Sequence, residues 1–313
     1  MSAGVRQGDW KMEQLKIGII GLDTSHVAAF AKVFNWKDDP FYIPGAGTIR
    51  KAYPGGSRLF SESWTRVEKF TDILRENGAE IVDSIADMAD MDAFLLTSCD
   101  GRQHPEQFRI LAPFGKPVFI DKPFACSYAD ALEIARLAEQ YGTPVMTASS
   151  IRYAAGVSSL PVKPSEITVA ETFGPLPLPP DYRDYFWYGI HSVELLYSYL
   201  GTGCESVRSV HLEDADLLIG SWKDGRTGFV CGSRKGASEF GVRLTAGTGH
   251  TVGIQDRSVS HIYTLTKHLI GFLKTGKSPI DLRESLEIMA FLEAASRSLN
   301  ESGRIVFLHE FAE

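Results

Sequence analysis

Chemically active side chains follow several short apolar segments in the first half of the sequence. Gly21 comes directly after one such segment, Thr97 and Ser98 follow a second, and Asp121 and Lys122 follow a third. If these segments are parallel strands, their carboxyl ends meet at one edge of a sheet, where α/β proteins bind ligands. This convergence predicts a ligand site that contains a lysine ammonium, a carboxylate and hydroxyl groups.

The first of these strand ends is an altered dinucleotide-binding motif. An apolar strand, a tight turn at Gly21 and a helix are the opening of a βαβ unit that holds a diphosphate at the helix N-terminus. The second and third glycines of the usual G-x-G-x-x-G are replaced here by Asp23 and His26, while Thr24 and Ser25 offer hydroxyl donors. The stretch alone is equally compatible with an ordinary strand–helix turn in which Asp23 or Ser25 caps the helix.

Composition limits the possible classes of protein. The chain has 313 residues, 44% of them hydrophobic, and a net charge of −7. This length suits two globular domains, and the negative charge argues against nucleic acid and anionic membranes as partners. No apolar run approaches the roughly 20 residues of a membrane span. The first 14 residues are polar and lack a signal core, so we expect a loose leader.

Cysteine and histidine spacing gives no metal motif. The four cysteines are far apart and show no C-x-x-C pair, which predicts reduced thiols in the cytoplasm. Asp23, His26, His104 and His191 fall near predicted strand or helix ends without the local spacing of metal ligands, so we expect no metal site.

Strands and helices alternate through residues 1–148, which predicts a Rossmann domain with a doubly wound parallel sheet. No carboxylate stands at the end of the second strand, where an NAD-binding fold holds the ribose, and Ser57 and Arg58 follow instead. The choice between NAD and NADP therefore stays open. The expected strands cover 15–20, 48–53, 81–82, 92–97, 117–120 and 144–147, and the expected helices 27–34, 67–76, 104–111 and 128–141.

Residues 149–313 contain successive strands without intervening helices. This pattern predicts an α+β domain with a largely antiparallel open sheet. The expected strands cover 166–173, 206–221, 226–233, 240–246 and 304–308, and the expected helices 190–200, 260–275 and 282–300.

Motifs along nearly the whole chain resemble one family. They are IGIIGLDTSH, TSCDGRQH, VFIDKPFACS, GIHSVELL and TGKSPIDLRESLEIMAFLEAASRS. In this order they are similar to the glucose–fructose oxidoreductase / inositol dehydrogenase / rhizopine-catabolism (Gfo/Idh/MocA) family of Rossmann oxidoreductases. Asp121-Lys122-Pro123 stands for the family's Glu-Lys-Pro, and Thr97 and His104 match the segment after the fourth strand.

The resemblance implies hydride transfer between NAD(P) and a hydroxyl carbon of a sugar, cyclitol or related polyol. It places Lys122 beside the nicotinamide, where an ammonium stabilises a developing alkoxide, and His191 as acid/base. The family's aspartate four residues before this histidine is Trp187 here. The expected cofactor contacts are Gly21, Asp23, Thr24, Ser25, His26, Thr97, Ser98, His104, Asp121 and Lys122, and the expected substrate contacts are Arg152, Tyr153, Asp184 and Tyr188.

Two other functions stay open at this point. The altered glycine loop, the missing ribose carboxylate and Trp187 also suit a non-redox Rossmann protein that binds a nucleotide or sugar derivative. A lyase or hydrolase with a retained nicotinamide is the other. In each case we expect a small-molecule ligand and a homodimer or homotetramer, paired through the open face of the second sheet.

Overall fold

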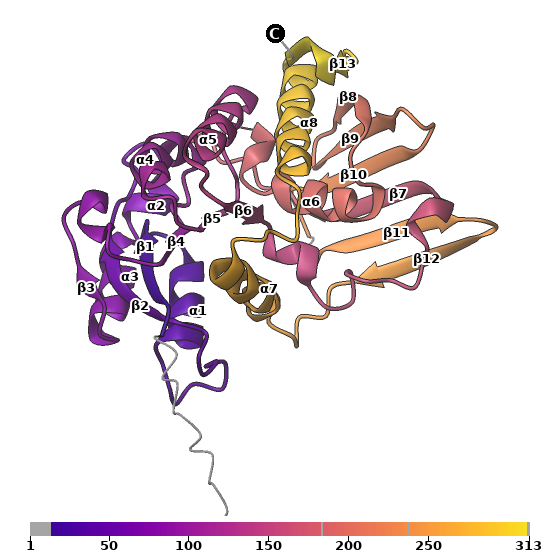
Figure 1. Ribbon diagram of the computed structural model, residues 1–313. Helices are drawn as coiled ribbons and strands as arrows, with labels where there is room; N and C mark the ends of the chain where they lie inside the picture. Colours follow the sequence, from indigo (N-terminus) through magenta and orange to yellow (C-terminus); the bar gives the residue numbers. More distant parts are fainter. Residues whose placement is uncertain (1–13, 183, 237, 312–313) are drawn as a thin grey trace, which may run out of the picture.

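The computed structural model describes residues 14–182, 184–236 and 238–311. Two sheets with their covering helices lie side by side, the first domain in indigo to magenta and the second in pink to yellow (Figure 1). The expected leader lies outside the described residues except for Gln14. Within the described part of the chain, no helix is long and apolar enough to cross a membrane.

The first sheet is parallel throughout, with the order β3-β2-β1-β4-β5-β6. The predicted doubly wound sheet is therefore confirmed. The strand order reverses between β1 and β4, so a ligand crevice is expected above their carboxyl ends. The strands are β1 (Lys16–Ile20), β2 (Thr48–Tyr53), β3 (Glu80–Ile81), β4 (Ala93–Leu96), β5 (Val118–Asp121) and β6 (Val145–Ala148).

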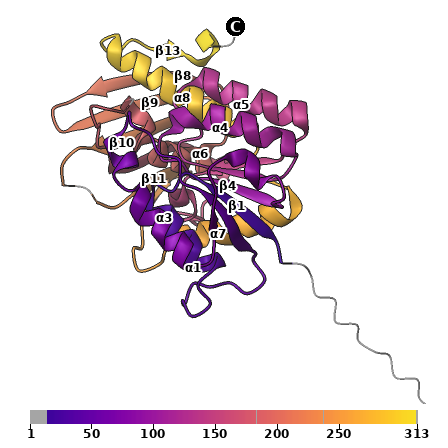
Figure 2. The ribbon, with the colours of Figure 1, turned by 90° about the vertical axis from the view of Figure 1, so that its left-hand side faces the viewer.

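Helices cover both faces of this sheet. Apolar side chains of α1, α3 and α7 form one core with the sheet, and those of α4 and α5 join the core on the other side (Figure 2). Helix α7 comes from the second half of the sequence and nevertheless packs on α1 and β5. The helices are α1 (Ser25–Phe34), α2 (Ser61–Trp64), α3 (Val67–Glu76), α4 (His104–Leu111), α5 (Tyr128–Tyr141) and α7 (His261–Thr275).

The second sheet has the order β12-β11-β7-β10-β9-β8-β13. All neighbouring strands are antiparallel except β7 and β10, so the predicted largely antiparallel sheet is confirmed. Helices α6 (Gly189–Leu200) and α8 (Leu282–Asn300) pack on it. The strands are β7 (Ile167–Pro175), β8 (Cys204–His211), β9 (Ala215–Trp222), β10 (Thr227–Ser233), β11 (Gly241–Ala246), β12 (Gly249–Ile254) and β13 (Val306–Phe307).

The strands of this sheet differ from the prediction in two places. The single strand expected over 206–221 is the hairpin β8–β9, closed where the Leu212 amide donates to the Ala215 carbonyl at 2.9 Å. Apolar residues continue on both sides of the turn, and the turn contains no glycine or proline, so the sequence pattern gives no sign of it. Strand β12 was missed because its glycines and its exposed edge position leave no alternating pattern.

Short 3₁₀ helices complete the description. They occupy turns that the sequence pattern does not distinguish from loops. They are η1 (Ile85–Met88), η2 (Gly101–Gln103), η3 (Ala112–Phe114), η4 (Ser150–Tyr153), η5 (Pro164–Glu166), η6 (Asp184–Phe186) and η7 (Leu308–Phe311).

Candidate active site

A cavity of about 610 Å³ lies between the first sheet and the loops of the second domain. The N-terminal turn of α1 and the end of β5 form its wall in the first domain. Helix α6, the start of α7 and the turns after β10 and β12 form the opposite wall. Its principal side chains are Thr24, Ser25, His26, Arg66, Lys122, Trp187, Tyr188, His191, Arg234, Phe240, Arg257 and His261.

Lys122 stands at the end of β5, buried and facing an aromatic ring. Its Nζ lies 4.4 Å from the centre of the Trp187 ring. Trp187 occupies the sequence position at which the family has an aspartate. Burial lowers the pKa of Lys122, and the Asp121 charge partly offsets this. A cis peptide bond joins Lys122 to Pro123. The lysine thus has an aromatic neighbour in place of a carboxylate.

His26 and Asp121 link the first helix to the fifth strand. The Nδ1 of His26 lies 2.5 Å from Asp121 Oδ2, and the other carboxylate oxygen accepts the Lys122 backbone N–H at 2.9 Å. Burial would raise the pKa of Asp121, but the charge and hydrogen bond of His26 outweigh it and lower the pKa. Asp121 is therefore an ionised group that orients its neighbours.

His191 faces the same cavity from α6. Its Nδ1 is 2.7 Å from Ser149 Oγ, and the edges of Tyr188 and Phe240 pack against the ring. Burial, followed by the charge of Lys122, lowers the pKa of His191 well below its usual value. The imidazole is neutral at pH 7, and Nε2 is the ring nitrogen left for a ligand.

Arg152, a predicted substrate contact, lies outside this cavity. It pairs with Glu194 at 3.3 Å and Glu284 at 2.5 Å and so ties η4 to α6 and α8. Burial raises the pKa of Glu194 to about 7, and its carboxylate accepts the Ser149 backbone N–H. The ion pairs hold the backbone of Ser149, which in turn holds His191.

Of the other predicted substrate contacts, one lines the cavity and two do not. Tyr188 lines the cavity. Tyr153 instead stacks on His268 with ring centres 4.3 Å apart, and Asp184 begins η6 without lining the cavity. Tyr153 was expected there from the family resemblance after the sixth strand, and Asp184 as a replacement for the aspartate missing at Trp187, but neither lines the cavity.

The altered glycine loop carries a buried cluster that we name the Asp23 clasp, formed by Asp23, Ser63 and Cys99. Asp23 is 0% exposed. It accepts the Cys99 backbone N–H at 2.9 Å and the Ser63 hydroxyl at 2.5 Å. Burial raises the pKa of Asp23, and these hydrogen bonds offset part of the rise. The clasp joins the ends of β1 and β4 across the crevice and connects them to α2.

The remaining predicted cofactor contacts bond to the protein itself. A Cβ on Gly21 would lie 2.3 Å from the Ser98 nitrogen, so the two loops touch at this point. Thr97 donates to the Gly21 carbonyl at 2.8 Å, and Ser98 donates to Gln107 at 2.9 Å. The two ring nitrogens of the buried His104 lie 3.1 Å from the Phe124 carbonyl and 2.8 Å from the Ser98 carbonyl. None of these side chains lines the cavity.

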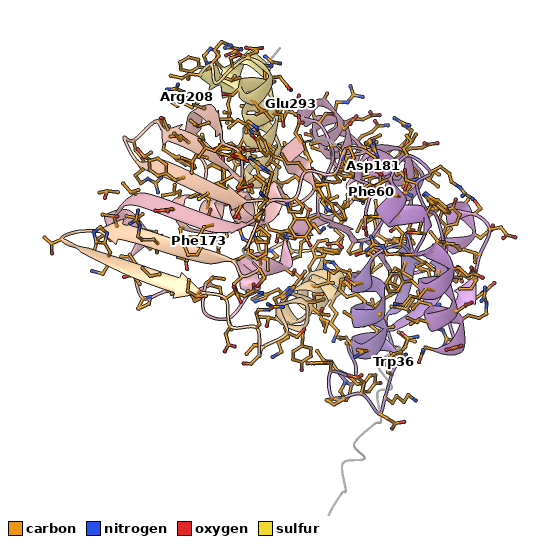
Figure 3. All side chains as sticks on the ribbon, turned by 180° about the vertical axis from the view of Figure 1, so that it is seen from behind. Trp36, Phe60, Phe173, Asp181, Arg208 and Glu293 are labelled. Carbon is orange, nitrogen blue, oxygen red and sulfur yellow. The ribbon has the colours of Figure 1, made fainter. Side chains whose placement is uncertain are left out.

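A segment of the first domain closes over the clasp. Phe60 is buried against Tyr182 and Trp187, with ring centres 4.6 and 4.7 Å away, and the adjacent Ser61 donates to Asp181 (Figure 3). Arg58 lies over the ring of Trp64 at 4.9 Å. The residues of this segment follow β2, whose end holds the adenosine ribose in a dinucleotide-binding fold, and they contact one another and other protein residues instead.

The family resemblance is confirmed for the first domain. A family model described as an oxidoreductase family with an NAD-binding Rossmann fold matches residues 15–149. Residues 15–149 are therefore similar to the NAD-binding domain of that oxidoreductase family. No curated protein sequence matches the chain.

Solved structures resemble the chain over nearly its full length, at identities that establish the fold. A probable dehydrogenase from Thermotoga maritima has a TM-score of 0.75 at 17% identity, covering 95% of this chain and 99% of its own. Myo-inositol dehydrogenase from Lactobacillus casei, solved with NAD(H) and myo-inositol, has 0.72 at 14%, covering 94% and 96%. An oxidoreductase from Agrobacterium radiobacter, solved with NAD+, L-tartaric acid and magnesium, has 0.69 at 16%, covering 95% and 99%.

The residues present fit one part of a dinucleotide. The N-terminal turn of α1, with Thr24 and Ser25, faces the cavity together with Lys122, and helix N-termini favour phosphate groups. Asp23 stands where the fingerprint has its second glycine, which lets the backbone approach the pyrophosphate, and its carboxylate is engaged in the clasp instead. We therefore expect the closed clasp to weaken binding of a whole dinucleotide in the usual crevice.

Several residues of the cavity were missed from the sequence. Arg66, Arg234 and Arg257 come from three separate loops, and His261 begins α7 with its Nδ1 2.8 Å from Ser150 Oγ. Ser149, which holds His191, follows β6 without any motif. No local spacing links these positions, so only the fold brings them together. Among the described residues, no three His, Cys, Asp or Glu side chains are placed to hold a metal ion.

The buried His191 predicts a pH dependence of stability. Its pKa in the folded protein lies well below 6.5, so below about pH 6.5 the unfolded chain binds a proton that the folded chain does not. This histidine should lower the free energy of unfolding by up to about 1.4 kcal/mol per pH unit as pH falls. Urea unfolding at several pH values should give a shallower slope for His191→Gln. Equal slopes for the variant and the wild type would refute the assignment.

Proposed function

We propose that the protein is an NAD(P)-dependent oxidoreductase acting on a hydroxyl carbon of a sugar, cyclitol or related polyol. One observation carries the proposal: Lys122 and His191, from different domains, line one cavity with the N-terminus of α1. The similarity of the first domain to this family supports the reaction class. The four cysteines, all in the described part of the chain, form no disulfide, which supports a place in the reducing cytoplasm.

In this proposal two side chains act on the substrate hydroxyl. The neutral Nε2 of His191 takes the hydroxyl proton, while Ser149 holds the ring through Nδ1. The Lys122 ammonium, with the Trp187 ring on one side, stabilises the alkoxide that forms. A bound nicotinamide supplies the hydride acceptor. Tyr188 offers an aromatic surface to the substrate beside His191.

A second candidate is a non-redox protein that binds a sugar derivative. The Asp23 clasp favours it, because it closes the crevice that dinucleotides use in this fold. A screen of polyols and their keto forms, followed through the absorbance of reduced nicotinamide, separates the two. Turnover of any polyol supports the oxidoreductase. If the protein binds a sugar but neither turns over a polyol nor binds nicotinamide nucleotides, the second candidate is supported.

Trp187 predicts the effect of restoring a family residue. Trp187→Asp places a carboxylate four residues before His191 and removes the ring over Lys122. We expect polyol oxidation to be unchanged or faster, because the carboxylate restores a partner for the reacting groups. Steady-state kinetics checks this, with Trp64→Asp, in an exposed position on α2, as the control. A severe loss of turnover in a folded Trp187→Asp variant would show that the ring itself is required.

The outer face of the second sheet predicts a homodimer or homotetramer. Phe173, Leu217, Ile219, Phe229 and Cys231 lie on this face, partly exposed, and Phe173 is seen on it in Figure 3. We expect sedimentation as an oligomer at micromolar concentration and as a monomer for Phe229→Glu. Leu132→Glu, at an exposed position on α5, is the control. A wild-type protein that sediments as a monomer would contradict the prediction.

A further inference from the structure

The Asp, Glu, Lys and Arg side chains that line the cavity are all basic, in a chain of negative net charge. Arg66, Lys122, Arg234 and Arg257 line it, while the chain as a whole carries −7. Among the described residues that line the cavity there is no aspartate or glutamate. A neutral polyol gains little from this distribution of charge, whereas an anion is attracted by it.

Arg66 has bonding capacity left inside the cavity. It stands just before α3, and its nearest partners are Glu62 at 3.5 Å and the Cys99 sulfur at 3.6 Å. Its Nε is buried and has no hydrogen-bond partner among the described residues. An unpartnered buried guanidinium N–H is costly, so turning the Arg66 side chain toward an anionic ligand would relieve this cost. Arg66 is also close enough to lower the pKa of Lys122.

Arg234 and Arg257 act from the second domain in different ways. Arg234 is fixed by an ion pair with the buried Asp216 at 2.9 Å and by backbone carbonyls, so it contributes a positioned charge. Arg257 is exposed, with Ser238 at 3.3 Å and Glu239 at 3.7 Å. These long contacts leave its guanidinium able to turn toward a ligand.

The electrostatic environment of His191 agrees with this arrangement. After burial, the charge of Lys122 is the largest cause that lowers its pKa. A field that disfavours a proton on a histidine favours an anion in the same space.

We propose that the ligand of this cavity is an anionic sugar or polyol derivative, whose carboxylate or phosphate group is held by Arg66 and Arg257. Guanidinium groups bind both kinds of oxyanion through paired hydrogen bonds. The proposal rests on the proposed function, because it places the anion in the same substrate cavity.

Calorimetry without cofactor tests the proposal through matched compounds. D-glucose, D-gluconate, D-glucuronate, D-glucose 6-phosphate and inorganic phosphate are titrated into the wild type, Arg66→Gln, Arg257→Gln and the control Arg109→Gln. Arg109 is on α4 and pairs with Glu133 of α5, away from the cavity. We expect at least one anion to bind tenfold or more tightly than glucose, in a salt-dependent way. Both cavity variants should lose this preference, and the control should keep it.

The outcomes separate this proposal from the oxidoreductase proposal. Tighter binding of carboxylates or of phosphates identifies which anionic group the cavity takes. The inference is overturned if every anion, inorganic phosphate included, binds no tighter than glucose, or if the cavity variants behave like Arg109→Gln. Anion binding without hydride transfer would refute the oxidoreductase alone, and turnover of neutral polyols without anion preference would refute this inference alone.

Discussion

Replacing Lys122 by alanine is expected to reduce turnover by about 10²–10⁴-fold. The ammonium is buried at the cavity, 4.4 Å from the Trp187 ring centre, and no other lysine lines this space among the described residues. Its effect is confined to the reacting hydroxyl, so nicotinamide affinity should change little. Steady-state kinetics and calorimetry on the same preparation separate the two effects.

Two controls make this result specific. Lys122→Met keeps most of the side-chain volume beneath Trp187 and should lose turnover as strongly as alanine. Lys116→Ala, an exposed position before β5, should retain wild-type kinetics. If Lys122→Met were fully active, the ammonium would have no part in the reaction.

Replacing Asp23 by glycine is expected to tighten NAD(P) binding by about tenfold or more, because each 1.4 kcal/mol of removed opening cost is a factor of ten. The substitution restores the second glycine of the fingerprint and removes the carboxylate from the crevice. It also leaves the Ser63 hydroxyl and the Cys99 N–H without their acceptor, which should cost about 1–3 kcal/mol of stability. Calorimetry measures the affinity, and urea unfolding measures the stability.

Asp23→Asn is the matched control for the clasp. It keeps the volume of the side chain and a hydrogen-bonding oxygen, so the crevice should stay closed and nucleotide affinity should rise much less. A folded Asp23→Gly variant that binds no nucleotide more tightly than the wild type would show that the clasp is not what limits binding.

The first domain could be predicted from sequence because its signals are local. The buried strand before Gly21, the Asp121-Lys122-Pro123 turn and the amphipathic helix Tyr128–Tyr141 each depend on neighbouring residues. Parallel topology then brings strand ends together, so Lys122 could be placed at a site. The match of the family model to residues 15–149 agrees with these motifs.

The composition of the site could not be predicted in the same way. Whether Asp23 faces a ligand or the protein depends on Ser63 and Cys99, which are far away in sequence. Arg152 has the charge of a substrate contact, but Glu194 and Glu284 hold it elsewhere. Both contacts depend on tertiary packing, which local sequence patterns do not predict.

The lining of the cavity shows the same limit. Arg66, Arg234 and Arg257 lie in loops of different domains, and each looks like an ordinary surface charge in the sequence. Trp187 was recognised as a departure from the family, but its position over Lys122 was not expected. The structure therefore adds the environment of the reacting groups to a fold that the motifs already indicate.

Calorimetric titration of the wild-type protein with NAD+, NADH, NADP+ and NADPH tests the central claim most directly. We expect saturable binding of at least one of these four nucleotides, weakened by the closed Asp23 clasp but measurable below millimolar concentration. No binding of any of them at millimolar concentration would contradict it, and the cavity would then belong to a non-redox protein.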